Sequence, residues 1–592
     1  MKASYSSKKG VARNLLFFLL LFFMLPSMAI AQSTVRGIVT DDNGEPLPGI
    51  AVVKDGTSLA VSTDIDGRFA IKASEGDVLK FSYVGMESKT VKVGKENELN
   101  VKLSSSLTEL DEVVVVGYGT QKKVNVTGAV GMVDSKVIAA RPVQNVSQAL
   151  QGVIPGLNLT VGNSGGSLDG EMNINIRGTG TIGDGSGSSP LVLIDGIEGN
   201  LNTVNPNDIE SVSVLKDAAS ASIYGARASF GVILVTTKSG KSGKTNVNYS
   251  GNVRFNDAIG IPELMDSYTF AQYFNRASSN RGGGDIFSPA VMERIKAYQE
   301  GTLTATTVDN GSGIWQKWAN ANGNTDWFGE FYDNWVPSQE HNLSISGGTE
   351  KLQYVLSGSF LDQKGLLRHG TDKFQRYTLN SKITANITDW LKVTLNSKWT
   401  REDFQRPTYL TSSFFHNLAR KWPVHPAYDP NGFPMDEGEI EQMENGGEQN
   451  SQKDYYTNQL HVVIEPIKNW RINLEGSVRT TTQYQHWEVL PVHAYDVNGD
   501  PYYTVWDMGY GSYSAGSSRV DEYSWKENYY TTNIYSDYFK QFDNGHYFKV
   551  MAGFNAELYK NRSIEAIKNN LISPDVPTID TATDDPQAYG GY

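Results

Sequence analysis

Apolar and polar side chains alternate along much of residues 246–558. Residues 391–396 and residues 470–475 each place an apolar side chain at every second position, with polar or charged side chains between them. A period of two over about ten residues is typical of a β-strand that crosses a membrane as part of a barrel. The pattern predicts about nine such strands, over residues 245–256, 340–347, 351–362, 376–386, 389–401, 456–466, 469–481, 526–540 and 546–558.

The connections between these strands alternate in length. Very short turns are expected near residues 348–351, 388–389, 467–469 and 543–545, and longer segments near residues 257–339, 363–375, 402–455 and 482–525. Outer-membrane barrels place short turns at the periplasmic end and long loops at the external end. A soluble β-sandwich has no reason to sort its connections in this way. Residues 243–592 are therefore expected to form part of a transmembrane antiparallel β-barrel.

The first 31 residues have the pattern of a secretory signal peptide. Four cations, Lys2, Lys8, Lys9 and Arg13, precede an apolar run over residues 15–25, and residues 29–31 read Ala-Ile-Ala. The apolar run is about half the length that a membrane-spanning helix needs. We expect cleavage between Ala31 and Gln32 and export of the mature protein.

Two smaller domains are expected between the signal peptide and the barrel. Residues 32–104 contain short strands separated by turns, which favours a small β-sandwich. Residues 124–242 contain an α/β unit, with short helices over 146–152 and 217–224. Its strands are expected over residues 172–177, 191–194, 209–215 and 231–237.

Composition narrows the possible functions. The net charge is −13 with an isoelectric point near 5.2, which disfavours nucleic acid as the main partner. The chain has no Cys, so disulfides, thiolate metal sites and catalytic Cys are excluded. The mean hydropathy is −0.38, and no apolar run long enough for a membrane helix follows the N-terminus.

The motifs of enzyme chemistry are incomplete or absent. Gly178, Gly180 and Gly183 match a dinucleotide fingerprint, but a Gly- and Ser-rich segment follows where a helix should begin. Residues 243–245 resemble the end of a Walker A loop, but Lys238 stands where the earlier glycine is required. HExxH does not occur, and no GxSxG nucleophile elbow, a sharp turn between a strand and a helix, is indicated. The sequence predicts a protein that is not an enzyme, with no cofactor and no metal site.

The linker over residues 105–123 contains an unusual β-branched run. It comprises Leu110, Asp111, Glu112, Val113, Val114, Val115 and Val116. Two interpretations are open: one more buried strand, or an exposed strand that can pair with the sheet edge of a partner.

The order of these parts resembles the SusC/RagA class of TonB-dependent outer-membrane transporters. The most specific stretches are residues 174–178 (INIRG), 190–196 (PLVLIDG), 213–227 (SVLKDAASASIYGAR) and 231–238 (GVILVTTK). The resemblance implies a mainly β fold: a carboxypeptidase-regulatory-like β-sandwich, an α/β plug domain, and a barrel of about 22 strands when complete. The nine strands counted here, followed by the polar residues 575–592, predict an N-terminal fragment.

The resemblance also implies a function. Such proteins import nutrients that are too large for porins, commonly oligosaccharides and in some cases peptides. A SusD-like surface lipoprotein forms a lid, and the TonB–ExbB–ExbD complex supplies energy through a TonB box, expected here at residues 110–116. Import of a glycan across outer-membrane lipid is the first hypothesis. A peptide or metal-chelate importer is an alternative, and so is a surface-binding protein or adhesin that transports nothing.

The resemblance selects nine residues of the plug motifs, Arg177, Gly178, Asp195, Gly196, Lys216, Asp217, Tyr224, Gly225 and Arg227. Their charged members are expected either to hold the plug to the barrel wall or to form ordinary surface ion pairs. Trp315, Trp318, Trp327, Trp335, Trp422 and Trp506 are candidates for stacking on sugars. The alternative for each Trp is a place in an interfacial girdle or a loop core.

Overall fold

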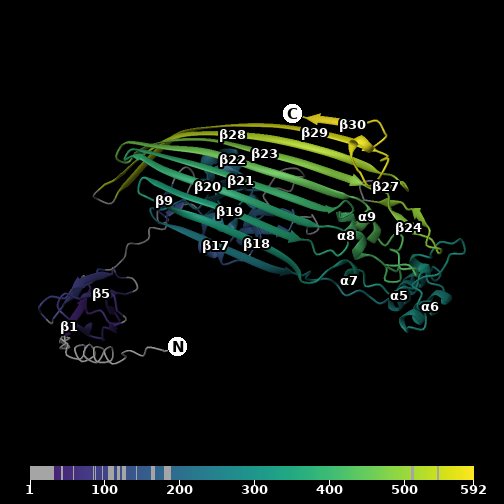
Figure 1. Ribbon diagram of the computed structural model, residues 1–592, viewed down its shortest axis with the longest axis horizontal. Coiled ribbons are helices and arrows are strands. Elements are labelled where there is room, and N and C mark those ends of the chain that lie inside the picture. The colour runs from purple at the N-terminus through teal and green to yellow at the C-terminus, as the bar shows by residue number, and fades with distance from the viewer. Residues whose placement is uncertain are drawn as a thin grey trace, which may run out of the picture. The chain divides into compact units, whose positions relative to one another are not determined.

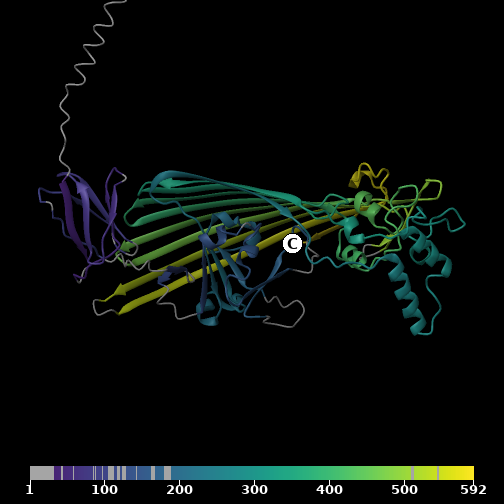
Figure 2. The same cartoon turned by 90° about the horizontal axis from the view of Figure 1, so that it is seen from below.

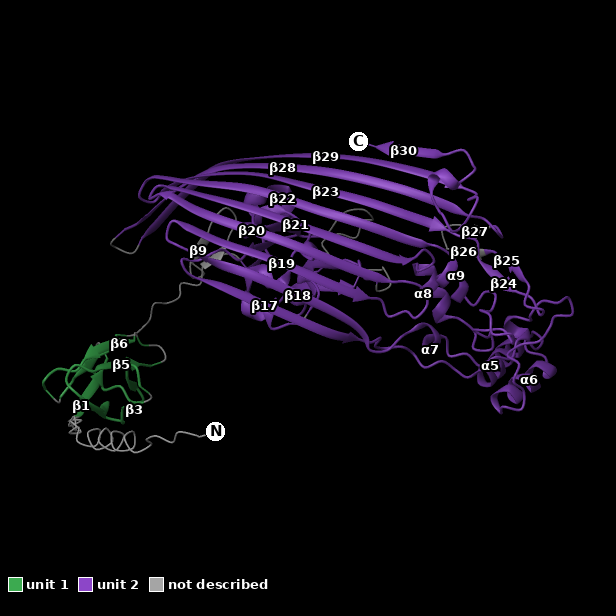
Figure 3. Cartoon of the chain, viewed as in Figure 1, with its two compact units in different colours: residues 1–113, 122–124 green, residues 114–121, 125–592 purple. Residues whose placement is uncertain are grey.

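The structure is a computed structural model of the 592-residue chain (Figure 1). It describes residues 33–41, 44–57, 59–83, 86, 88–96, 98–104, 113–115, 120–122, 129–141, 143–161, 167–178, 189–507, 512–542 and 546–591. The expected signal peptide with Ala31 and Gln32 lies outside these residues, as do Leu110, Asp111, Glu112 and Val116. The chain forms two compact units, residues 1–113 with 122–124 and residues 114–121 with 125–592 (Figure 3).

The first unit contains the predicted β-sandwich. One sheet has the order β4-β1-β7 and the other β3-β2-β5-β6. The strands are β1 (Ser33–Thr40), β2 (Ala51–Lys54), β3 (Ala60–Ser62), β4 (Arg68–Ala73), β5 (Val78–Ser82), β6 (Lys89–Lys92) and β7 (Val101–Lys102). Strand β4 buries every second side chain, and Phe69 and Ile71 pack with Phe81 in a core between the two sheets.

The second unit begins with the α/β domain. Its five-stranded sheet has the order β10-β15-β16-β13-β14, and β13 and β16 run parallel near its middle. These strands are β10 (Val130–Asp134), β13 (Leu191–Ile194), β14 (Ile197–Glu198), β15 (Ile209–Leu215) and β16 (Val232–Thr237). A separate hairpin pairs β11 (Leu157–Val161) with β12 (Met172–Ile176). Short helices α2 (Ser135–Ala139), α3 (Val146–Leu150) and α4 (Ala218–Ala221) complete the domain, followed by the 3₁₀ segment η4 (Ser222–Ala228).

A ten-stranded antiparallel sheet, here called the wall, forms the rest of the unit. Its strands follow in chain order: β17 (Gly243–Asn256), β18 (Val336–Gly348), β19 (Leu352–Lys364), β20 (Lys373–Thr388), β21 (Leu391–Pro407), β22 (Glu448–Ile467), β23 (Trp470–Val489), β28 (Arg519–Gln541), β29 (Tyr547–Asn569) and β30 (Gln587–Gly591). All nine predicted strands are present. Short β30 lies in the segment that the sequence pattern marks as a polar loop, and it pairs with β29.

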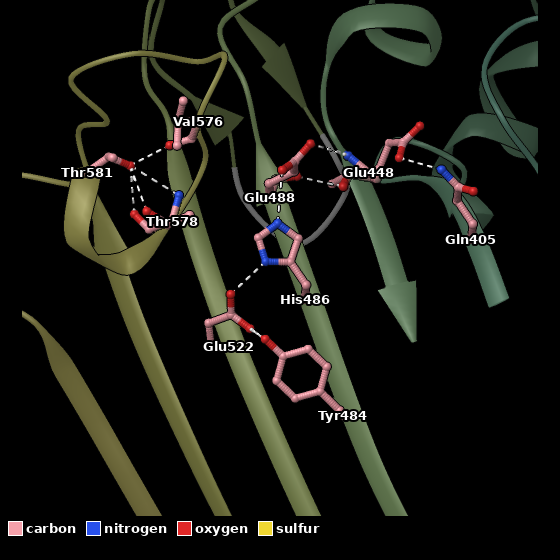
Figure 4. Close-up of polar contacts among 10 residues, drawn as sticks. Gln405, Glu448, Tyr484, His486, Glu488, Glu522, Val576, Thr578 and Thr581 are labelled. Atoms are coloured by element: carbon pink, nitrogen blue, oxygen red, sulfur yellow. Dashed lines mark hydrogen bonds and ion pairs between the residues drawn. The ribbon is translucent and has the colours of Figure 1, made fainter. Parts of the chain in front are cut away.

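Several wall strands extend four or more residues beyond their predicted ends, and these extensions point toward the long connections. Strand β22 begins at Glu448 rather than near residue 456, and β28 begins at Arg519 rather than near residue 526. On one face these extensions carry polar side chains instead of apolar ones. Figure 4 shows His486 between Glu522 and Glu488, with ring nitrogen to carboxylate distances of 2.7 and 3.0 Å. The alternation of apolar side chains therefore stops before the ladder of backbone hydrogen bonds does.

Short and long connections lie at opposite ends of the wall, as predicted (Figure 1). Among the residues described, no helix is both long enough and apolar enough to cross a bilayer. The long connections contain α5 (Ser267–Asn280), α6 (Pro289–Gln299), α7 (Trp327–Phe331), α8 (Ser412–Ala419) and α9 (Ile440–Asn445). Two small strand pairs also lie there: β24 (His493–Tyr495) with β25 (Pro501–Tyr503), and β26 (Trp506–Asp507) with β27 (Ser512–Tyr513).

The long connections pack on one another around aromatic side chains. Trp327 is fully buried with Phe331 and Phe414, and Trp422 packs beside Phe287 in a second cluster. A buried ion pair joins Lys421 to Glu439, with 2.6 Å between Nζ and Oε2. Of the candidate sugar-stacking residues, Trp327 and Trp422 thus belong to loop cores, whereas the side chain of Trp335 is 70% exposed.

Candidate functional site

The α/β domain lies against one face of the wall (Figure 2), and the contact is made by alternate residues of the wall strands. On β20, β21 and β22 the cross-strand neighbours Lys382, Asn396 and Gln459 form a row. All three reach the same residue of the α/β domain, Asp195. Because alternate side chains of a strand face opposite sides, Leu379, Leu395 and Leu460 lie on the other face, where each is about half exposed.

Asp195 occupies the tight turn between β13 and β14. Its φ is 51°, and that of Gly196, which follows, is 86°. Within the α/β domain its carboxylate accepts hydrogen bonds from the backbone N and the Oγ1 of Thr237, at 2.9 and 2.7 Å. The turn therefore carries the carboxylate toward the wall in a fixed orientation.

The wall surrounds this carboxylate with donors. Lys398 Nζ forms an ion pair with Oδ2, Lys382 Nζ lies 3.4 Å from Oδ1, and Asn396 Nδ2 donates to Oδ2 at 3.0 Å. Gln459 Nε2 donates to the backbone oxygen of Asp195 at 3.0 Å. We call this set of interactions the Asp195 contact.

The charge of Asp195 is stabilised although its side chain is only 8% exposed. Burial alone would raise the pKa of its carboxyl group. The charges of Lys398 and Lys382 and the hydrogen bonds from Lys398 and the Thr237 backbone outweigh burial and hold the pKa well below its ordinary value. The contact is therefore ionic at every physiological pH.

Further wall side chains bind backbone oxygens of the α/β domain. Arg376, which is 3% exposed, donates to the carbonyl oxygens of Asn202 and Gln144, both at 2.6 Å. Arg479 donates to the carbonyl oxygen of Glu198, and Thr400 Oγ1 donates to that of Thr203 at 3.0 Å. Because these hydrogen bonds are accepted by backbone oxygens, they depend on the conformation of the α/β-domain loops and not on which side chains the loops carry.

Arg227 makes a second ionic contact with the wall. Its guanidinium donates to both carboxylate oxygens of Glu557 on β29, at 2.5 and 2.8 Å, and to Glu198 at 3.1 Å. Its side chain is 42% exposed, so this pair is more open to solvent than the Asp195 contact.

The remaining motif residues serve local structure in the contacts observed. Asp217 caps α4, and hydrogen bonds, first from the Ala129 backbone and next from Ser220, lower its pKa to about 2. The backbone N of Lys216 donates to the carbonyl oxygen of Ala129 at 3.1 Å. Positive φ angles of 60°, 99° and 64° occur at Arg177, Gly178 and Gly225, and Tyr224 packs on the core near α4. Of the nine predicted residues, Asp195 and Arg227 thus contact the wall through their side chains.

The wall partners Lys398, Lys382, Arg376 and Arg479 were not predicted from the sequence. Their positions in the alternation place them on the inner face. Many inner positions are polar, however, so that signal does not single them out. Among the residues described, no group of three or more metal-binding side chains is arranged to hold an ion.

The predicted TonB box is described only in part. Val113–Val115 form β8, which pairs with β9 (Thr120–Lys122). The extended backbone fits both interpretations of this segment, the buried strand and the pairing strand.

An α/β domain against the wall, with a β-sandwich before it in the chain, is the arrangement that the resemblance to TonB-dependent transporters implies. Residues 122–232 match the TonB-dependent receptor plug domain, and residues 35–115 match the CarboxypepD_reg-like domain. The α/β domain is hereafter called the plug.

Similar proteins narrow the class. TonB-dependent receptor P39 of Formosa agariphila is 32% identical over 434 residues, which cover 71% of this chain and 38% of the relative. TonB-dependent receptor SusC of Bacteroides thetaiotaomicron is 32% identical over 409 residues, which cover 66% of this chain and 36% of SusC. The chain thus spans less than two fifths of the length of these relatives.

A solved structure shares the fold. The RagAB peptide importer in its open-open state aligns with a TM-score of 0.64 at 23% identity, covering 81% of this chain and 53% of the other. The chain belongs to the SusC-like TonB-dependent receptors, a family of outer-membrane β-barrel proteins. These relatives are receptors and not enzymes, in agreement with the sequence prediction.

Proposed function

We propose that the protein takes part in TonB-dependent import of a polar nutrient across the outer membrane. The observation that carries this proposal is the ionic seating of the plug on the inner face of the wall through the Asp195 contact. A plug held in this way must rearrange before a solute can pass. The periplasm and the outer membrane offer no nucleotide for that work, so the force has to arrive through a tether.

The tether we propose is the segment at residues 110–116, acting as the TonB box. Strand addition would give a partner a ladder of main-chain hydrogen bonds, which can bear load. The extended conformation of Val113–Val115 supports this role. The partner would be the TonB–ExbB–ExbD complex.

An oligosaccharide or glycan is the first candidate for the solute. A cavity of about 300 Å³ lies between the plug and the wall, toward the long connections. Hydroxyl, amide and aromatic side chains line it, among them Asn380, Thr400, Tyr455 and Trp525. Aromatic faces combined with hydrogen-bonding groups suit the alternating apolar and hydroxyl surfaces of a sugar.

A peptide is the second candidate, because the same cavity carries charges of both signs. Lys398, Lys453 and Arg479 line it together with Asp208 and Glu527. A peptide, with one terminus of each sign, could pair with both kinds of charge, which a neutral oligosaccharide does not need.

We further propose that a SusD-like surface lipoprotein covers the long connections. Apolar side chains stand out on these connections, with Ile259 94% exposed and Trp335 70% exposed. Ile261 and Met265 on the same segment as Ile259 are also exposed, and apolar side chains that gather on one surface are typical of interaction surfaces.

Growth tests the function and the solute together. A strain lacking the gene would be grown on purified oligosaccharides and on purified peptides as the limiting nutrient, with complementation by the natural gene. A defect on one class of oligosaccharide supports glycan import, and a defect confined to peptides supports the second candidate. Unchanged growth and uptake on all of them would count against nutrient import.

A further inference from the structure

Two cavities lie between the plug and the wall, and a third continues from them along the inner face of the wall. The outer cavity of about 300 Å³ is the one described above, a middle cavity has about 240 Å³, and an inner cavity has about 990 Å³. The inner cavity lies at the short-turn end of the wall, where residues 387–390 contribute to its lining. The row therefore leads from the external end of the wall to the periplasmic end.

Successive inward-facing residues of a wall strand line the inner, the middle and then the outer cavity. On β21, Lys392 lines the inner cavity, Thr394 and Asn396 the middle one, and Lys398 and Thr400 the outer one. Residues 392–400 of an extended strand span roughly 26 Å, close to the ~30 Å hydrocarbon thickness of a bilayer.

The same order holds on β23. Arg471 and Asn473 line the inner cavity, Glu475 the middle one, and Arg479 and Thr481 the outer one. Strands β21 and β23, which are not neighbours in the sheet, thus pass the inner, middle and outer cavities in the same order.

The inner and middle cavities adjoin each other, because His461 and Tyr535 line both. The middle and outer cavities meet at the Asp195 contact. Asp195 and Lys382 line the middle cavity, whereas Lys398 lines the outer one. The ion pair between Asp195 and Lys398 therefore crosses the boundary between them.

The plug packs more closely against the wall at β19 and the first residues of β20 than it does beside these cavities. The cavity between the plug and strands β19 and β20 holds only about 50 Å³. There Arg376 is 3% exposed and bonded to two plug carbonyl oxygens. Free space is thus concentrated beside the later part of β20, from Thr378 onward, and beside β21, β22, β23 and β28.

We propose that this row of cavities is the route of the imported solute, and that the Asp195 contact is its gate. The solute passes beside a plug that stays in the barrel. A local movement of the turn at Asp195 and Gly196 joins the outer cavity to the middle one. Charges of both signs along the row, such as Lys382, Glu475 and Arg471, replace the hydration of a polar solute as it passes. The inference rests on the proposed import function.

Two cross-linked variants distinguish a local gate from departure of the whole plug. The chain contains no Cys, so an introduced pair has no competing thiol. One variant combines Asp195→Cys with Asn396→Cys, which pins the gate. The matched control combines Arg227→Cys with Glu557→Cys, which pins the plug at a contact outside the three cavities. Each pair is joined by a short bis-methanethiosulfonate reagent and released by reductant.

We expect the Asp195–Asn396 cross-link to abolish uptake of the growth-supporting solute, and reduction to restore it. Uptake by the Arg227–Glu557 variant should be the same before and after reduction. Loss of uptake with both cross-links would show that the whole plug leaves and would overturn the route. Unchanged uptake with both, or loss with the control pair alone, would also overturn it. Absence of uptake by the natural protein would instead refute the import function.

A second pair of variants serves if Asp195→Cys does not fold. Thr394→Trp fills the middle cavity, and Thr480→Trp places the same bulk on the opposite face, where Thr480 bonds Asn528. The first variant should lose uptake at normal surface abundance, and the second should keep it. Equal uptake by the two variants would contradict the route.

Discussion

Removal of the charge of Asp195 should loosen the plug more than any other single change at the plug–wall interface. Asp195→Asn keeps the size of the side chain but leaves Lys398 and Lys382 without their counter-charge. The side chains of these lysines are 19% and 12% exposed, and that of Asp195 is 8% exposed. The two cations would remain largely shielded from water.

Loss of one partner of a buried ion pair costs about 3–5 kcal/mol. The cost falls on the seated state alone, because a displaced plug exposes these groups to water. Each ~1.4 kcal/mol changes an equilibrium tenfold. The population with an open Asp195 contact should therefore rise roughly a hundredfold to a few thousandfold.

Hydrogen exchange measures this opening in the full chain. The amide of Thr237 donates to Asp195 Oδ1 and that of Asp195 donates to Val235, so both report on the turn. Asp454→Asn is a matched control. Asp454 pairs with Arg401 at 2.8 Å through side chains 22% and 36% exposed, and the variant should leave exchange in the turn unchanged. Equal exchange in Asp195→Asn and the natural protein would refute the reasoning.

The other predictions concern the tether, the second contact, the loop core and pH. Val114→Pro removes a backbone donor and should abolish uptake while the barrel still folds. Val114→Thr keeps that donor and should keep uptake. Full uptake by the proline variant would exclude strand pairing at this segment. Arg227→Ala should change plug stability by only ~0–1 kcal/mol, because the side chains of its ion pair with Glu557 are 42% and 23% exposed. A denaturation series would measure this change. Glu439→Ala should destabilise the loop core by about 3–5 kcal/mol by stranding buried Lys421, whereas Glu439→Leu with Lys421→Met should recover most of the melting temperature. The pKa of Asp195 in the folded protein lies below its unfolded value of about 3.9, so the stabilisation by its charge is present above about pH 3.9 and is lost only as the pH falls through the folded pKa. Opening of the turn, measured by hydrogen exchange and corrected for intrinsic exchange, should therefore stay constant from about pH 5 to pH 8. A marked rise within that range would contradict the lowered pKa of Asp195.

Much of the fold was predictable because the wall strands separate two environments. Leu391, Val393 and Leu395 face outward and their neighbours face the plug, so the alternation marks the strand. The prediction stopped short where outward positions become polar, as at His486 and Glu522, because the backbone ladder continues without the apolar signal.

Of the Asp195 contact, the sequence predicted the plug residue but not its partners on the wall. Asp195 lies in a short specific motif, whereas its partner Lys398 is one of several cations on β21. The alternation places Lys398 on the inner face and Arg401 on the outer face. It does not show that a turn 203 residues earlier in the chain meets Lys398, because that contact depends on how the plug docks.

Dependence of uptake on TonB tests the central claim most directly. Uptake of the growth-supporting solute would be measured in matched strains with and without active TonB, at equal surface abundance of the protein. A plug seated by the Asp195 contact and displaced through a tether requires that uptake stop without TonB. Uptake that continues at the same rate in the strain without TonB would contradict the account.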